Sequence, residues 1–224
     1  MTNTENIIAI GDIHGCCRSI EALMEKLTLY DDSQFVFIGD YIDRGPCSRE
    51  VVDLMLELNE QRNCIFLRGN HEQMLLDALE RGQSNLWLHN GGETTLRSYG
   101  TDPGAMDLPE EHIEFFRSTR LYYETPNYFF VHAGIPAHQT IKQSLEDPES
   151  YHDFLWTRDH INLVETPWEK KVIFGHTPRT IPIERPNMIG IDTGCVYSSF
   201  GYGKLTALLL PEEKFIHQFS LDND

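Results

Sequence analysis

Short apolar runs recur along the chain and outline most of its predicted elements. Buried strands are expected at 7–10, 35–38, 64–67, 128–131, 171–174 and 206–210. Between the first three runs, segments 19–29 and 48–58 carry apolar residues at the i, i+3, i+4, i+7 spacing of an amphipathic helix. Ser48 is the expected N-cap of the second helix. This alternating order predicts parallel strands that are joined by right-handed crossovers.

The second half of the chain has a different pattern. Residues 84–127 are expected to be helical and loop-like, whereas further strands follow at short intervals at 181–184, 188–192 and 215–219. This closer spacing favours antiparallel hairpins over further parallel units. Together the patterns predict the α/β (α+β) class, with two sheets packed together and helices outside, in a single domain over residues 1–224.

Composition limits the partners that we expect. The 18 basic and 35 acidic residues give a net charge of −17, which repels phosphate backbones and argues against nucleic-acid binding. The segment 1–6 has no lysine or arginine, and the apolar run that follows it is too short for a signal peptide or a membrane span. We therefore expect a cytoplasmic protein with no membrane partner. No pattern indicates an oligomeric state.

The five cysteines have no paired spacing, which argues against a thiolate zinc site and predicts reduced, inertly packed thiols. Four of them follow or flank the loops that are described next. The five are Cys16, Cys17, Cys47, Cys64 and Cys195.

Glycine and polar residues gather directly after five of the predicted strands. GDIHG follows the run at 7–10, GDYIDRG the run at 35–38 and RGNHE the run at 64–67. HAG and GHT follow the runs at 128–131 and 171–174. Any one of these turns is explained by helix capping or by a satisfied loop histidine. Five of them at strand ends indicate one shared site, because ligands bind where loops converge beyond the carboxyl ends of strands.

The residue types at these turns are those of a catalytic metal site. Oxygen and imidazole donors without thiolates suit manganese, iron or zinc. Six donors are too many for one catalytic ion that keeps an open position, but they suit two ions about 3.5–4 Å apart that share a carboxylate. The six candidates are Asp12, His14, Asp40, Asn70, His132 and His176.

In this order, the five motifs resemble the phosphoprotein phosphatase family of dinuclear metallophosphoesterases. The chain is most similar to the compact bacterial and phage branch, typified by the bacteriophage lambda phosphatase, from about residue 7 to about residue 210. The resemblance implies a calcineurin-like fold, a β-sandwich flanked by helices, with two divalent ions. Mn²⁺ is the expected metal, with iron or zinc as alternatives. The implied ligands are Asp12 and His14 for the first metal, Asp40 for both, and Asn70, His132 and His176 for the second.

The resemblance also implies roles for neighbouring residues. Arg44, Arg68 and Arg158 match phosphate-binding arginines, and guanidinium groups offer paired donors to phosphoryl oxygens. His71 is the implied general acid. Asp43 would orient its imidazole and raise its pKa, although an ion pair with Arg44 is the alternative for that carboxylate.

The expected activity is hydrolysis of phosphoserine and phosphothreonine in proteins or peptides, with phosphotyrosine as a further candidate. A hydroxide that bridges the two metals would attack phosphorus directly while His71 protonates the leaving oxygen. The alternatives are a symmetrical diadenosine tetraphosphate hydrolase, whose family shares GDIHG and GNH, and a non-enzymatic metal-dependent scaffold. The retained Asp43, the full RGNHE motif and the short chain favour the phosphatase. Residues 97–127 and 137–153 match no motif and are expected to shape the groove beside the metals.

Overall fold

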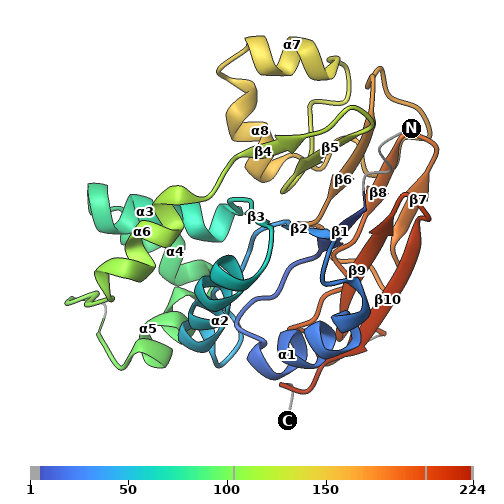
Figure 1. Ribbon diagram of the computed structural model, residues 1–224. Coiled ribbons are helices and arrows are strands. Elements are labelled where there is room, and N and C mark those ends of the chain that lie inside the picture. The colour runs from blue at the N-terminus through green and yellow to red at the C-terminus, as the bar shows by residue number, and fades with distance from the viewer. Residues whose placement is uncertain (1–5, 103, 200, 223–224) are drawn as a thin grey trace.

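Two five-stranded mixed sheets form the centre of the computed structural model, which describes residues 6–102, 104–199 and 201–222 (Figure 1). The first sheet contains β1 (Ile7–Ile10), β2 (Gln34–Phe37), β3 (Cys64–Phe66), β9 (Lys204–Leu210) and β10 (Lys214–Phe219). The second contains β4 (Tyr122–Glu124), β5 (Tyr128–Val131), β6 (Lys171–Phe174), β7 (Ile183–Arg185) and β8 (Met188–Gly190). The strand orders are β10-β9-β1-β2-β3 and β4-β5-β6-β8-β7. The prediction of two sheets with helices outside is confirmed. The expectation that the chain has no signal peptide rested on residues 1–6, and residues 1–5 lie outside the described part of the chain.

Helices connect the strands and cover the outer faces of both sheets. They are α1 (Cys17–Lys26), α2 (Ser48–Gln61), α3 (Asn70–Arg81), α4 (Ser84–Trp87), α5 (Glu93–Tyr99), α6 (Glu110–Ser118), α7 (Ile141–Glu146) and α8 (Ser150–Trp156), with a 3₁₀ turn η1 (Thr28–Tyr30) and a π-helical turn η2 (Leu88–Gly92). In the described part of the chain, none of them combines the length and the apolar character that a membrane span needs.

The two helices expected from apolar spacing are present as α1 and α2, but the predicted cap is wrong. Ser48 is the first residue of α2 and follows Cys47, whose side chain makes no capping hydrogen bond. The Ser48 hydroxyl instead accepts the N–H of Asp43 at 3.1 Å and lies 2.9 Å from the hydroxyl of Thr95. Ser48, which the sequence suggested as a helix cap, therefore stabilises the loop that contains Asp43.

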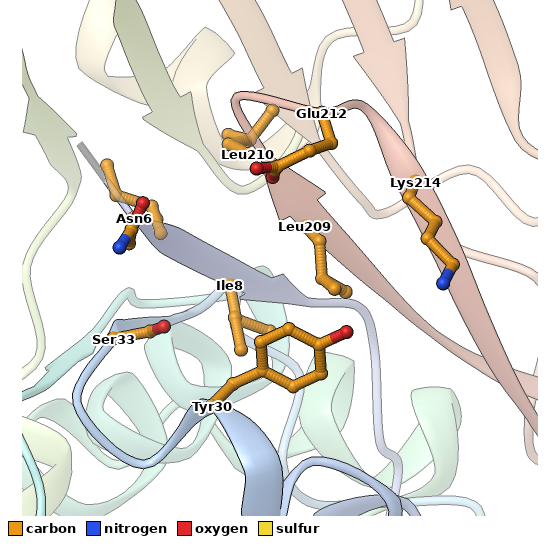
Figure 2. A pocket seen from close by; sticks show the side chains of 9 residues that line it. Asn6, Ile8, Tyr30, Ser33, Leu209, Leu210, Glu212 and Lys214 are labelled. Atoms are coloured by element: carbon orange, nitrogen blue, oxygen red, sulfur yellow. The ribbon is translucent and has the colours of Figure 1, made fainter. Parts of the chain in front are cut away.

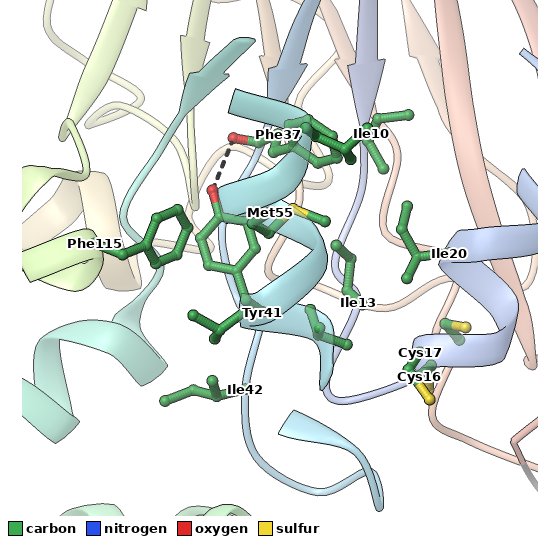
Figure 3. Close-up of a cluster of buried hydrophobic side chains, with 14 of the residues drawn as sticks. Ile10, Ile13, Cys16, Cys17, Ile20, Phe37, Tyr41, Ile42, Met55 and Phe115 are labelled. Atoms are coloured by element: carbon green, nitrogen blue, oxygen red, sulfur yellow. Dashed lines mark hydrogen bonds between the residues drawn. The ribbon is translucent and has the colours of Figure 1, made fainter. Parts of the chain in front are cut away.

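Apolar side chains fill three layers because most strands are buried on both faces. Ile7 and Ala9 of β1 point into the layer between the sheets, and Ile8 and Ile10 point toward the helices. Figure 3 shows the helix-facing layer, where Met55 of α2 packs with Ile10 and other side chains. The third layer lies between the second sheet and α7 and α8. Burial on both faces explains why the strands read as continuous apolar runs and not as alternating patterns.

The pairing of strands in the second half corrects the sequence prediction in part. β7 and β8 form an antiparallel hairpin, as do β9 and β10. However, β5 pairs in parallel with β6, and β6 pairs in parallel with β8. The reason is that the long connection from β5 to β6 contains α7 and α8, which carry the chain back across the sheet. As a result, β5 and β6 end at the same edge.

Candidate metal centre

The loops that follow the central strands of both sheets bring the predicted donors together. Asp12 and His14 follow β1, Asp40 follows β2, and Asn70 begins α3 after β3. His132 and His176, from the second sheet, follow β5 and β6. All six side chains are buried, with at most 6% of any residue exposed. The φ angles of His14, Asp40 and His176 are 48°, 53° and 64°, a strained left-handed conformation that is typical of functional sites.

One group of donors converges on a single point. Nε2 of His132 lies 3.1 Å from Oδ1 of Asn70 and 3.2 Å from Nδ1 of His176. Oδ1 of Asp40 is 3.4 Å from the same nitrogen. Nδ1 of His132 is 3.0 Å from the carbonyl of Ile38 and donates to it, so its Nε2 directs a lone pair at the other donors. This group has the composition of a site for a divalent cation.

A second group lies on the other side of the Asp40 carboxylate. Nδ1 of His14 donates to the carbonyl of Ile42 at 2.9 Å, which leaves the Nε2 lone pair 3.4 Å from Oδ2 of Asp40. Both oxygens of Asp12 accept the N–H of His176, at 3.2 and 3.0 Å. The Asp12 carboxylate therefore lies beside the group, but its oxygens are not among the ligand atoms that lie closest together. Asp40 directs one oxygen at each group, which is the arrangement that a ligand shared by two ions would need.

The electrostatics of both groups suit bound cations. Burial lowers the pKa of His14 and His132 and, together with His132, brings that of His176 to about 2, so the imidazoles are neutral and able to ligate. Burial and the repulsion of neighbouring carboxylates raise the pKa of Asp12. Burial and Asp40 also raise the pKa of Asp192, which the sequence analysis did not assign, to about 7. Buried carboxylates that repel each other are stabilised by positive charge, so these residues fit two divalent ions.

Two glycines leave the space that these carboxylates need. A Cβ atom at Gly69 would lie 2.1 Å from Oδ1 of Asp40, and one at Gly175 would lie 2.1 Å from Oδ1 of Asp12. Either substitution would displace a donor.

His71 and Asp43 form a buried pair next to the shared ligand. Nδ1 of His71 is 2.6 Å from Oδ2 of Asp43, and the Nε2 atom has no protein partner and lies 4.0 Å from Oδ2 of Asp40. The indole N–H of Trp87 and the hydroxyl of Thr95 also donate to the Asp43 carboxylate, at 2.9 and 2.6 Å. The sequence analysis assigned no role to either donor, and both lie in the segment 84–127 that it expected to be helical and loop-like. Within the described residues Asp43 pairs with His71, and the alternative pair with Arg44 is not formed.

Two of the three predicted phosphate-binding arginines lie at the donor groups. Arg44 donates to Nε2 of His14 at 2.7 Å, and Nη2 of Arg158 lies 3.5 Å from the carbonyl oxygen of His176. Neither forms an ion pair with an acidic side chain in the part of the chain that the structure describes. Their N–H groups can therefore turn to an anionic ligand.

Arg68 lines the groove between α3 and α8, and its N–H groups are hydrogen-bonded to protein atoms, so its phosphate-binding role stays a prediction. Its Nε donates to the hydroxyl of Thr119 at 3.1 Å, and Nη1 donates to Gln73 at 3.1 Å. Nη2 reaches the carbonyl oxygens of Phe116, Arg117 and Thr119 at 2.9–3.3 Å. Nε and Nη2 thus bind the carboxyl end of α6, where a cation satisfies orphan carbonyls, and Nη1 binds a side chain of α3.

Glu72 has a structural role that the sequence analysis did not assign. One carboxylate oxygen accepts the N–H groups of Asp40 and Gly69, both at 2.9 Å. The other accepts the N–H of Tyr41 at 2.9 Å and of Ile42 at 3.4 Å. This buried side chain therefore joins the loop after β2 to the start of α3.

An open groove of about 400 Å³ adjoins the donor groups between α3 and α8. Its lining includes Met74, Tyr151, His152 and Trp156, and the Trp156 ring packs edge-on against that of His176 with centroids 6.1 Å apart. Tyr151 and His152 belong to the segment 137–153 that was expected to shape such a groove.

A separate pocket of about 320 Å³ lies at the opposite edge of the first sheet (Figure 2). It is lined by residues at the amino end of β1 and the carboxyl end of β9, including Ile8, Tyr30 and Leu209. It lies at the amino end of β1, whereas the donors Asp12 and His14 follow the carboxyl end of that strand, so it is not part of this site.

Two packed sheets that jointly present buried aspartate, histidine and asparagine side chains are the architecture of a metallophosphoesterase. The chain belongs to the calcineurin-like phosphoesterase family, whose model matches residues 5–208.

Named relatives fall into two groups. The chain is 31% identical to the asymmetrical bis(5'-nucleosyl)-tetraphosphatase PrpE of Oceanobacillus iheyensis, with 92% of this chain and 89% of the relative covered. It is 33% identical to serine/threonine-protein phosphatase 1 of Salmonella typhimurium, with 91% of each covered. A crystal structure of a putative diadenosine tetraphosphatase has the same fold, with a TM-score of 0.69 at 21% identity over 99% of this chain and 96% of that one.

We predict that Glu72→Gln destabilises the protein by about 2–4 kcal/mol, because the new amide group would face backbone N–H donors and leave them unsatisfied. The check is the free energy of unfolding in urea. Glu80→Gln is the matched control, since Glu80 lies on the same helix but is largely exposed. Equal effects of the two substitutions would contradict the role that we assign to Glu72.

We predict that substitution of one arginine lowers activity, whereas substitution of another lowers stability. Arg44→Ala should lower kcat/KM by about 10²–10³-fold, because it removes N–H groups that can turn from His14 to a phosphoryl group. Arg68→Ala should lower the free energy of unfolding by about 1–3 kcal/mol through the lost carbonyl contacts, with little change in kcat. Kinetics and urea unfolding of both variants are the measurements. A large kcat loss in a stable Arg68→Ala variant would restore the original expectation.

Proposed function

We propose that the protein is a metal-dependent phosphomonoesterase of the phosphoprotein phosphatase type, acting on phosphoserine and phosphothreonine in proteins or peptides. The observation that carries this proposal is the pair of His71 and Asp43, whose free Nε2 atom lies beside the shared metal ligand. A serine or threonine alkoxide is a strong base and leaves only with a proton, so it gains most from a positioned acid. A nucleoside polyphosphate is a much weaker base and gains less.

The residues of the site divide the work of such a reaction. Bound ions, most simply two Mn²⁺ with iron or zinc as alternatives, would supply Lewis-acid stabilisation and lower the pKa of a water molecule. Arg44 and Arg158 bind the phosphoryl oxygens through guanidinium N–H groups. Asp43 accepts from Nδ1 of His71, so the proton on Nε2 is the one delivered to the leaving oxygen. The residues that would hold the ions are Asp12, His14, Asp40, Asn70, His132 and His176.

The charge state of His71 supports its role as the acid. Burial by itself lowers its pKa, but the Asp40 and Asp43 carboxylates outweigh burial and raise the pKa above its ordinary value. A raised pKa favours the protonated imidazole that a general acid needs. Burial likewise raises the pKa of Asp43, while the hydrogen bond from His71 opposes that rise.

The second candidate is an asymmetrical dinucleoside tetraphosphatase. The names of the PrpE relatives favour it, and they indicate asymmetrical cleavage in place of the symmetrical cleavage considered from the sequence. The groove beside Trp156 also offers the aromatic rings of Tyr151 and His152, on which a base could stack. The scaffold alternative gains no support, because every donor and the acid pair are present.

None of the five cysteines forms a disulfide in the structure. We therefore propose a reducing compartment, the cytoplasm, as the place of action.

We expect the Mn²⁺-loaded protein to have a higher kcat/KM on phosphoserine and phosphothreonine peptides than on diadenosine tetraphosphate. His71→Asn should lower kcat on the peptides by about 10²–10⁴-fold and on an aryl phosphate by much less, because phenolates leave more readily. His89→Asn, which changes an exposed histidine on η2, is the control. A preference for the dinucleotide by orders of magnitude would establish the second candidate and refute the first.

The pH dependence tests Asp43 separately. His71 acts in its protonated form, so activity is lost as the pH rises through its pKa. Asp43→Asn removes one of the carboxylates that raise this pKa, and the alkaline fall of kcat should therefore begin at a lower pH. Asp53→Asn, at an exposed carboxylate that pairs with His112, is the control and should leave the profile unchanged. An unshifted alkaline limb in Asp43→Asn would show that His71 is not the titrating acid.

A further inference from the structure

Three possible metal ligands converge at a place that the proposed reaction does not use. In the described residues, three groups of histidine, cysteine or acidic side chains bring their ligand atoms within 4.8 Å of one another. Two of these groups contain Asp40 and belong to the catalytic centre. The third consists of Cys17, Cys47 and Asp222. The geometric property that marks the catalytic centre therefore marks one further site.

Three segments that are distant in sequence supply these ligands. Cys17 is the first residue of α1, and Cys47 immediately precedes α2. Asp222 follows β10 near the carboxyl end of the chain. The N–H of Cys47 donates to the carbonyl of Gly15 at 3.0 Å, which fixes the two cysteine-bearing loops against each other. Figure 3 shows Cys17 beside Cys16 at the beginning of α1.

The carboxylate of Asp222 is already held in position. Its Oδ1 accepts the N–H of Arg18 at 3.1 Å and lies 3.9 Å from Sγ of Cys17. Its Oδ2 accepts the N–H of Ser19 at 3.0 Å. Cys47 and Asp222 are partly exposed, whereas Cys17 is buried. The group is thus preorganised on one side and open to solvent on the other.

The ligand types of the group suit a thiophilic cation, which must displace the thiol protons on binding. Burial, the Cys47 thiol and the Asp222 carboxylate raise the pKa of Cys17 to about 12. Ionised thiols at this place would repel each other and the carboxylate, and a bound cation would remove that repulsion. Thiolates select soft ions such as zinc, whereas the nitrogen and oxygen donors of the catalytic centre also accept manganese. The two sites would therefore take different ions.

We propose that Cys17, Cys47 and Asp222 form a second metal site, separate from the catalytic centre, that binds one thiophilic divalent cation such as Zn²⁺. Two sulfur ligands, one oxygen ligand and a water complete a tetrahedron. On binding, each thiol releases its proton to solvent and forms a sulfur–metal bond, with no change of oxidation state. The ion ties the starts of α1 and α2 to the carboxyl-terminal segment. The unpaired spacing of the cysteines did not reveal the site, because folding and not sequence distance brings them together.

Titration of the reduced, full-length protein with Co²⁺ tests this site. The catalytic donors contain no sulfur, so a thiolate-to-cobalt charge-transfer band in the near ultraviolet reports the new site alone. We expect the intensity of this band to stop rising once the thiolates of each protein molecule bind one Co²⁺ ion. We expect Zn²⁺ to abolish the band by displacing that ion. Cys17→Ser and Cys47→Ser should each abolish the band, and Asp222→Asn should weaken cobalt binding. Cys64→Ser, on β3 and outside the group, should leave the band unchanged.

Several results would overturn the proposal. They are a wild-type protein without the band, a band that survives Cys47→Ser, and loss of the Cys17 and Cys47 thiols to a disulfide in the reduced preparation. Thermal unfolding of each serine variant, compared with the wild type, shows whether a lost band reflects a lost ligand or a lost fold. A Cys47→Ser variant that keeps both its fold and its phosphoesterase activity but lacks the band would support the new site whatever the substrate proves to be.

Discussion

The metal centre depends on a buried carboxylate that is not a ligand. Glu72 accepts backbone N–H groups from Gly69, Asp40 and Tyr41, each at 2.9 Å, and so fixes the loop after β2 against the start of α3. Asp40 and Asn70 lie at the two sides of this junction. Burial and the nearby Asp40 charge raise the pKa of Glu72 to about 7, and the N–H groups offset part of that cost by hydrogen bonding to the charged form. The left-handed backbone of Asp40 persists because its surroundings hold it there.

Similar supports hold the other functional side chains, and most of them come from the helical middle of the chain. Trp87 and Thr95 orient Asp43, and Asp43 orients His71. Arg68 joins the end of α6 to α3 through hydrogen bonds to the carbonyl of Arg117 and the side chain of Gln73. Groups that must be placed to within a fraction of an ångström are thus fixed by neighbours that never touch a substrate.

Sequence reasoning reached the parts of the structure that depend on local pattern. Apolar runs predicted the strands, helical spacing predicted α1 and α2, and motifs after strands predicted the donors that the fold brings together. It failed where the answer depends on which distant segments meet. The parallel pairing of β5 with β6, the partners of Arg68 and the role of Glu72 all depend on contacts across tens of residues. The sequence alone does not show whether a glutamate binds a metal, caps a helix or stabilises a loop.

The two halves of the donor set come from different sheets. Asp40 extends from the first sheet and His132 from the second, and the imidazole of His132 is hydrogen-bonded to the carbonyl of Ile38 across the boundary. The packing of Ile38 and Phe130 in the layer between the sheets therefore sets the distance between ligands that belong to separate layers. Cations that bind only the assembled pair of sheets add their binding energy to the cohesion of the sandwich. A substitution that disturbs the packing of this layer would therefore weaken the affinity for ions, even though every ligand residue is unchanged.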